Sequence, residues 1–177
     1  MALFKKKKRE EQKNGVKDTA NYFENDTTIG KKRPFSMAEA HKRLRTNVLF
    51  SFPNESECRV VGVTSAMAHE GKTTTSMNLA YDMLQAGKKV LLIDADMRKS
   101  VILKRSLKSQ NILGLSELLS GQADISQVLY NTQNPNFDVI FSGRFPPNPV
   151  ELISSDNFKK NLEKFEEIYD YIIIDSP

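Results

Sequence analysis

Three short segments of this 177-residue chain carry residue types that can bind phosphate groups and a divalent cation. The first, residues 66–73, reads Ala-Met-Ala-His-Glu-Gly-Lys-Thr and has the form of a P-loop, with alanine in the usual place of the first glycine. Backbone N–H groups of such a loop surround phosphates at the start of a helix. We expect the Lys72 ammonium to reach the phosphates and the Thr73 hydroxyl to bind Mg²⁺. The expected nucleotide-binding residues are Ala68, His69, Glu70, Gly71, Lys72, Thr73 and Thr74.

Two aspartates, Asp94 and Asp96, end the second segment, which begins with the apolar run 90–93. Side chains two positions apart on an extended chain point to the same side. Both carboxylates are therefore expected at the carboxyl edge of a sheet, where open α/β folds bind ligands. Two carboxylates held together repel one another unless a cation or a proton separates them. We expect Mg²⁺ beside these aspartates; the alternative is a solvated loop without a ligand.

The third segment is the apolar run 171–174 followed by Asp175. Four apolar residues before an aspartate have the Walker-B form, in which the carboxylate holds Mg²⁺ directly or through water. This pattern alone is weak evidence. Together with the other two segments it indicates a site for a nucleotide and its magnesium ion.

Buried strands are expected to position all three segments. Runs rich in β-branched and apolar residues predict four strands, and the segments between them predict helices. The strands are expected at 59–64, 88–94, 137–143 and 171–175, and the helices at 72–85, 115–119, 125–129 and from about 150 or 156 to 168. This alternation predicts an α/β fold of three layers, P-loop NTPase-like, with a mainly parallel sheet.

A further helix is expected before the first strand, over about residues 36–50. Ser36 and Glu39 have the spacing of a capping box, in which a hydroxyl and a carboxylate satisfy free N–H groups of the first turn. Glu39 is also placed to pair with Arg43 within the helix. An uneven apolar stripe along this helix comprises Ala38, His41, Leu44, Val48 and Leu49.

Charge is distributed unevenly along the chain. Residues 1–45 hold 13 Lys and Arg against 6 Asp and Glu, whereas residues 46–177 hold 13 against 16, so the basic excess belongs to the N-terminal segment. A folded surface that binds nucleic acid would itself carry that excess, which argues against nucleic acid as a partner. Residues 1–35 are expected to form a basic disordered tail, either simply solvated or attracted to an anionic membrane surface.

The remaining composition argues against several other classes of site. The single cysteine, Cys58, rules out an intramolecular disulfide. A zinc site is not expected either, because Cys58 has no second cysteine beside it and His41 and His69 are remote from each other in sequence. No run approaches the ~20 apolar residues needed to span a bilayer. With 39% hydrophobic and 27% charged residues, the chain has the composition of an ordinary globular protein.

The combination of motifs closely resembles the bacterial tyrosine kinase (BY-kinase) family, which regulates capsular and exopolysaccharide synthesis. It is most similar to the stand-alone, CpsD/CapB-like form. Besides the three segments above, residues 114–121 (Gly-Leu-Ser-Glu-Leu-Leu-Ser-Gly) and 146–153 (Pro-Pro-Asn-Pro-Val-Glu-Leu-Ile) resemble the intervening segments of that family.

This resemblance implies an autophosphorylating kinase that transfers phosphoryl groups from ATP to protein tyrosines, with Mg²⁺ as cofactor. Asp94 would orient or deprotonate the incoming tyrosine hydroxyl, and Asp96 would help to hold metal and substrate. The implied catalytic residues are Lys72, Asp94 and Asp96, and the implied metal ligands are Thr73, Asp96 and Asp175.

The resemblance also implies partners and a location. Glu39, Lys42 and Arg45 match the oligomerisation motif of the family and would join neighbouring copies in a homo-oligomeric ring. Lysine stands at position 42 where arginine is usual, and lysine lacks the bidentate fork of arginine. The implied adaptor is a transmembrane protein of the polysaccharide chain-length-regulator type, so the kinase is expected in the cytoplasm at the inner face of the plasma membrane.

The expected domain organisation follows the extent of the resemblance. After the tail comes a P-loop kinase domain over 36–177, with the oligomerisation helix at about 36–50 and the nucleotide-binding core at 58–177. Family members continue past the Walker-B strand to a tyrosine-rich end. The chain is therefore expected to be truncated and its fold incomplete at the C-terminus, with an exposed edge on its last strand.

Two other functions remain open. A division-site or chromosome-partition ATPase with a deviant Walker A motif would hydrolyse ATP, but such proteins carry a signature lysine where this chain has Met67. A non-catalytic module, in which the nucleotide orders the ring and the docking of the adaptor, is the second alternative.

Overall fold

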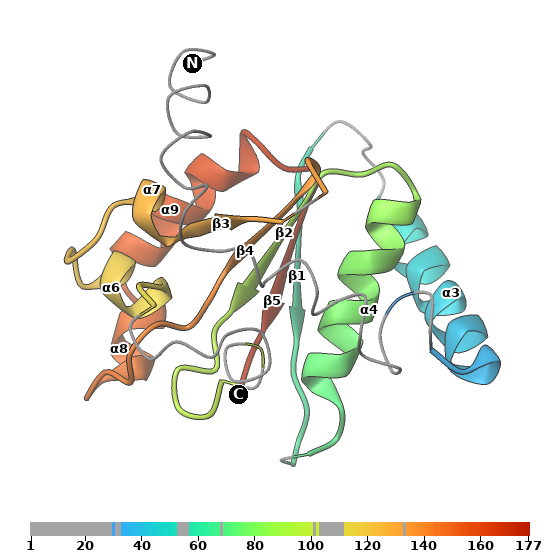
Figure 1. Cartoon of the computed structure of the whole chain (residues 1–177), viewed down its shortest axis with the longest axis horizontal. Coiled ribbons are helices and arrows are strands. Elements are labelled where there is room, and N and C mark those ends of the chain that lie inside the picture. Colours follow the sequence, from blue (N-terminus) through green and yellow to red (C-terminus); the bar gives the residue numbers. More distant parts are fainter. Residues whose placement is uncertain are drawn as a thin grey trace.

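The computed structural model describes residues 30, 33–52, 57–67, 69–100, 102, 112–132 and 134–177. A five-stranded sheet with helices on both faces forms its centre (Figure 1). One face carries α3 (Phe35–Phe50) and α4 (Lys72–Gln85), and the other carries α6 (Leu115–Leu119), α7 (Ile125–Val128), α8 (Pro149–Ile153) and α9 (Asp156–Glu166). The predicted three-layer α/β fold is thus confirmed, whereas most of the predicted tail falls outside the described residues.

The order of the strands brings the three chemical segments together. The order is β1 (Arg59–Val63), β5 (Tyr171–Asp175), β2 (Val90–Asp94), β4 (Phe137–Ile140) and β3 (Leu129–Asn131). The first four strands are parallel, and β3 pairs antiparallel with β4. The expectation of an exposed edge on the last strand is wrong, because β5 lies between β1 and β2 and is paired on both sides.

Apolar side chains on both faces of the central strands explain why these strands are buried. Val90 and Leu92 of β2 pack into the core beneath α4, whereas Leu91 and Ile93 pack into the core that holds Phe165 of α9. Side chains of a strand alternate between its two faces, so a strand covered on both sides must be apolar throughout. The polar residues that end β2 and β5 therefore emerge only at the carboxyl edge of the sheet.

Several predicted boundaries need correction. Helix α3 begins at Phe35 after Pro34 and has no side-chain cap, so the predicted capping box at Ser36 is wrong. The strand predicted to reach residue 143 ends at Ile140, because the following carbonyls of Phe141 and Ser142 accept hydrogen bonds from the start of α6. Within the described residues, no helix is long and apolar enough to cross a membrane.

The helices after β4 also differ from the prediction in their division. The segment after position 149 forms two helices, α8 and α9, and the hydroxyl of Ser155 caps the second by accepting a hydrogen bond from the Phe158 N–H. The helix predicted to end at residue 129 stops at Val128, where the chain turns into β3. The helix over 72–85 and the strand over 171–175 have the predicted bounds.

Candidate nucleotide-binding site

The register of the sheet places the three chemical segments in one row. Val63, the last residue of β1, is the register partner of Asp175, and Asp175 is in turn the partner of Asp94. The Ala95 N–H donates to the Asp175 carbonyl at 2.8 Å, which ties the ends of β2 and β5 together. The loop that leaves β1 therefore starts beside both aspartates.

That loop has the backbone form of a phosphate-binding turn. Gly71 directly precedes α4 with φ +85°, and His69 has φ +67°, a left-handed conformation that non-glycine residues other than Asn, Asp and His rarely adopt. Alternating backbone hand lets successive N–H groups face one concavity, and the amino end of a 14-residue helix adds a partial positive charge. Ala68, also predicted to bind the nucleotide, lies outside the described residues.

Side chains of the loop form hydrogen bonds within the loop, and a bound phosphate would replace them. The Lys72 ammonium donates to the Ser65 hydroxyl at 3.0 Å and to the Met67 carbonyl at 3.3 Å. The Met67 N–H donates to the Glu70 carboxylate at 3.0 Å, and this bond, with help from the Ser65 hydroxyl, lowers the pKa of Glu70. The loop thus holds a carboxylate against one of its own backbone donors, as an anion-binding loop is suited to do.

Asp175 is bound to the first two turns of α4. Its two oxygens accept hydrogen bonds from the Thr73 hydroxyl at 2.7 Å and from the Ser76 hydroxyl at 2.9 Å. Burial raises the pKa of Asp175, while these two hydroxyls counteract the increase. The sequence reasoning missed Ser76; its position one turn after Thr73, on the same face of the helix, is the signal that would have revealed it.

Asp94 lies fully buried at the end of β2, and both of its oxygens accept hydrogen bonds. The Asp96 N–H donates to one at 3.1 Å, and the Ser100 hydroxyl donates to the other. Burial raises the pKa of Asp94 to about 7, with a further increase from the carboxylates of Asp175 and Asp96. The sequence reasoning missed Ser100, which is separated from Asp94 by a six-residue excursion of the chain.

The chemistry of these groups fits a magnesium ion. Thr73 contributes a hydroxyl and Asp96 and Asp175 contribute carboxylates, and Mg²⁺ prefers such oxygen ligands. Burial raises the pKa of Asp94 and of Asp175, and repulsion from neighbouring carboxylates raises both further. A nearby cation would offset that repulsion. No group of three or more His, Cys, Asp or Glu side chains within the described ranges could by itself hold a metal ion. A magnesium ion here would need ligands from the nucleotide or from water as well.

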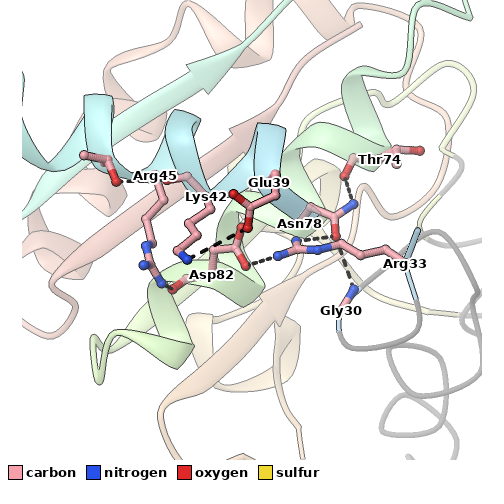
Figure 2. Close-up of polar contacts among 9 residues, drawn as sticks. Gly30, Arg33, Glu39, Lys42, Arg45, Thr74, Asn78 and Asp82 are labelled. Atoms are coloured by element: carbon pink, nitrogen blue, oxygen red, sulfur yellow. Dashed lines mark hydrogen bonds and ion pairs between the residues drawn. The ribbon is translucent and has the colours of Figure 1, made fainter. Parts of the chain in front are cut away.

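The three predicted oligomerisation residues lie on α3, apart from the loop and aspartates of the candidate site. Lys42 pairs with Glu39 at 3.9 Å, so the intrahelical partner of Glu39 is Lys42 where Arg43 was expected. Arg45 donates to the Asp82 carbonyl of α4 at 3.4 Å (Figure 2). Thr74, predicted to contact the nucleotide, lies in the first turn of α4, and its carbonyl accepts a hydrogen bond from the Asn78 side chain one turn later on the same helix (Figure 2).

Comparisons with known proteins place this site in a family. The family model for an AAA domain matches residues 59–177. Tyrosine-protein kinase CpsD of Streptococcus agalactiae is 42% identical over 139 residues, which are 78% of this chain and 59% of that protein. This chain therefore spans less than two thirds of the length of that relative.

Solved structures give the same assignment. The kinase domain of VpsO is 33% identical with a TM-score of 0.66, and the match covers 82% of this chain and 73% of that one. The chimerical protein CapA2B2 is 33% identical with a TM-score of 0.73, over 90% of this chain and 66% of that one. The septum site-determining protein MinD of Pyrococcus horikoshii, solved with Mg-ADP, is less similar, at 27% identity and a TM-score of 0.54 over 68% of this chain and 49% of that one. The chain belongs to the bacterial tyrosine kinase (BY-kinase) family, and its P-loop region is an AAA domain.

Proposed function

We propose that this chain binds ATP and Mg²⁺ and transfers the γ-phosphoryl group to protein tyrosines, its own included, in the control of capsular or exopolysaccharide synthesis. One observation carries the proposal: the sheet register sets Asp94 beside Asp175, and Asp175 is bonded to Thr73 of the P-loop helix. The similarity to tyrosine-protein kinase CpsD supports the reaction, and the resemblance of the motifs to the BY-kinase family supports the pathway.

The proposed roles follow from these positions. The loop N–H groups and Lys72 hold the phosphates, and Thr73, Asp96 and Asp175 hold the magnesium ion, which neutralises charge on the phosphates when bound. Asp94 orients the tyrosine hydroxyl and accepts its proton as the oxygen bonds to the γ-phosphorus. The bond from that phosphorus to the bridging oxygen breaks, and its electron pair leaves with ADP. Positioning and charge neutralisation suffice for this reaction, so the small set of residues is adequate.

The proposal includes assembly and location. Glu39, Lys42 and Arg45 would contact a neighbouring copy in a ring, and a transmembrane adaptor of the chain-length-regulator type would hold the kinase at the inner face of the membrane. The exposed side chains of Lys42 and Glu39 are available for such a contact, whereas Arg45 must first release its bond to α4. The similarity to CapA2B2, which is a chimerical protein, supports a partnership of the kinase with an adaptor.

A hydrolytic ATPase of the division or partition type is the second candidate. The fold similarity to MinD favours it, and Met67 at the position of the signature lysine argues against it. The two candidates differ in where the phosphoryl group goes, to tyrosine or to water.

One experiment separates these functions. The purified chain is incubated with Mg-ATP and an acidic tyrosine-containing polymer, and ADP and phosphotyrosine are measured in the same samples. The kinase forms phosphotyrosine in step with ADP, and Lys72→Ala forms neither because it binds ATP weakly. ADP with inorganic phosphate and no phosphotyrosine would identify the hydrolase. Nucleotide binding without ADP formation would identify a non-catalytic module, and full kinase activity of Lys72→Ala would refute the proposed site.

A further inference from the structure

The Asp94 carboxylate is held at both oxygens by its own loop. The loop leaves β2 after Asp94 and returns within six residues, so that the Ser100 hydroxyl donates to Oδ2 while the Asp96 N–H donates to Oδ1. Asp94 is fully buried and Ser100 is 8% exposed, so water competes little for either bond. Two hydrogen bonds to different oxygens fix the rotation of the carboxylate plane, which one bond alone would leave free.

Asp96 makes the turn that returns Ser100 to this place. Its Oδ1 accepts hydrogen bonds from the N–H groups of Arg98 at 3.2 Å and Lys99 at 2.9 Å, as aspartate side chains do in tight turns. Two residues past Ser100, the side chain of Ile102 is buried in the core beneath α4. The position of Ser100 is thus fixed by the Asp96 turn before it and by the buried Ile102 after it.

We propose that Ser100 is a positioning residue that sets the orientation of the Asp94 carboxylate toward the tyrosine hydroxyl; this inference rests on the proposed kinase function. Each carboxylate oxygen has two lone pairs, so the bonds from Ser100 and Asp96 occupy one lone pair on each oxygen. The remaining lone pairs then have fixed directions, and one of them receives the incoming hydroxyl.

The kinetic test removes the hydroxyl while leaving the nucleotide site intact. Ser100→Ala is expected to lower kcat by about 10- to 100-fold, the range in which small misplacements of reacting groups act. The KM for ATP stays near that of the wild type, because the Ser100 hydroxyl donates to Asp94, which has no role in holding the phosphates in the proposed mechanism. Ser100→Thr restores most of kcat, since it returns a hydroxyl at the same branch point. Ser120→Ala is the matched control, because among the described residues that exposed serine hydroxyl bonds only to backbone carbonyls of α6.

A second measurement needs no nucleotide and no activity. Hydrogen exchange of the Asp96 amide, followed by NMR on the free chain, reports the bond from that amide to Asp94 Oδ1. Ser100→Ala should lower the protection of this amide, and Ser100→Thr should return it, with amides of α4 unchanged as a check on folding. Unchanged Asp96 protection in Ser100→Ala overturns the inference even if the wild type proves to be a kinase.

The two measurements also separate failure of the inference from failure of the proposed function. A wild type that forms no phosphotyrosine refutes the kinase proposal, and with it the part of the inference that concerns the tyrosine hydroxyl. An active wild type whose kcat is unchanged in Ser100→Ala leaves the kinase standing and refutes the role of Ser100. A raised KM for ATP with unchanged kcat refutes it as well, since that result assigns Ser100 to nucleotide binding.

Discussion

Replacing Arg33 by alanine tests how the segment before α3 is bound to the P-loop helix. The guanidinium of Arg33 donates to the Asp82 carboxylate at 2.6 Å and to the Asn78 side chain at 2.9 Å, one turn apart on α4 (Figure 2). The side chains of Arg33 and Asp82 are only 9% and 5% exposed. The second oxygen of Asp82 is buried without a hydrogen-bond partner, so Arg33 supplies the only counter-ion that Asp82 has within the described residues.

The expected loss of stability follows from this burial. Removing one partner of a buried ion pair costs about 3–5 kcal/mol, because the other charge is left without compensation. We take the lower end, about 3 kcal/mol, because Asp82 can draw some water once the arginine side chain is gone. For a chain of this length each kcal/mol corresponds to roughly 2–4 °C in Tm, so Arg33→Ala should melt about 6–12 °C below the wild type.

The matched control is the exposed ion pair on α3. Lys42 and Glu39 are 64% and 45% exposed and 3.9 Å apart, so Lys42→Ala should cost only about 0.3–0.5 kcal/mol. Both variants are unfolded with urea and by heat, at a concentration where light scattering gives the monomer mass. A loss below about 1 kcal/mol for Arg33→Ala, or equal losses for the two variants, would refute the reasoning.

Three further predictions follow from single contacts. Burial and the nearby Arg33 lower the pKa of His41, so its contribution to stability is full above the unfolded pKa of about 6.5 and is lost as the pH falls below that value. Urea unfolding at several pH values should therefore show a steeper loss of stability for the wild type than for His41→Gln, and parallel curves would contradict this. A Cβ at Gly114 would meet the backbone of Gly143 and Phe141, whereas one at Gly62 would meet nothing within 4 Å. Gly114→Ala should therefore lower the free energy of unfolding by about 1–3 kcal/mol and Gly62→Ala by much less, and melting curves in the opposite order would contradict this. Burial and the carboxylates of Glu166 and Asp170 raise the pKa of Cys58 to about 11. Alkylation of Cys58 in the folded chain should therefore be slow at neutral pH and become faster as the pH approaches the pKa, and rapid labelling at neutral pH would contradict this.

Local sequence patterns were sufficient for the elements that hold the site. The apolar runs before Asp94 and Asp175 have the composition of strands buried on both faces, and the glycine before Lys72 marks the start of α4. Each of these signals lies within a few residues, so composition alone revealed it. The P-loop, the aspartate pair and the Walker-B aspartate could therefore be located before the fold was known.

Features that depend on distant residues could not be predicted in this way. The central place of β5 in the sheet is set by its packing between β1 and β2 and not by its own sequence. Its place as the last strand in the chain therefore led to the wrong prediction that it has an exposed edge. The bonds of Arg33 to Asp82 and of Ser76 to Asp175 join residues 49 and 99 positions apart. Strand β3 has only three residues, too few for a periodic pattern, and its pairing with β4 defines it.

The most direct test of the proposed site follows the label from [γ-³²P]ATP to phosphotyrosine in a single turnover, comparing the wild type with Asp94→Asn. The wild type should label tyrosine. Asp94→Asn should do so about 10²- to 10⁴-fold more slowly, the usual contribution of a positioned general base, while binding ADP as tightly as the wild type. Equal rates of tyrosine labelling in the two proteins would contradict the assignment of Asp94 and, with it, the proposed arrangement of the site.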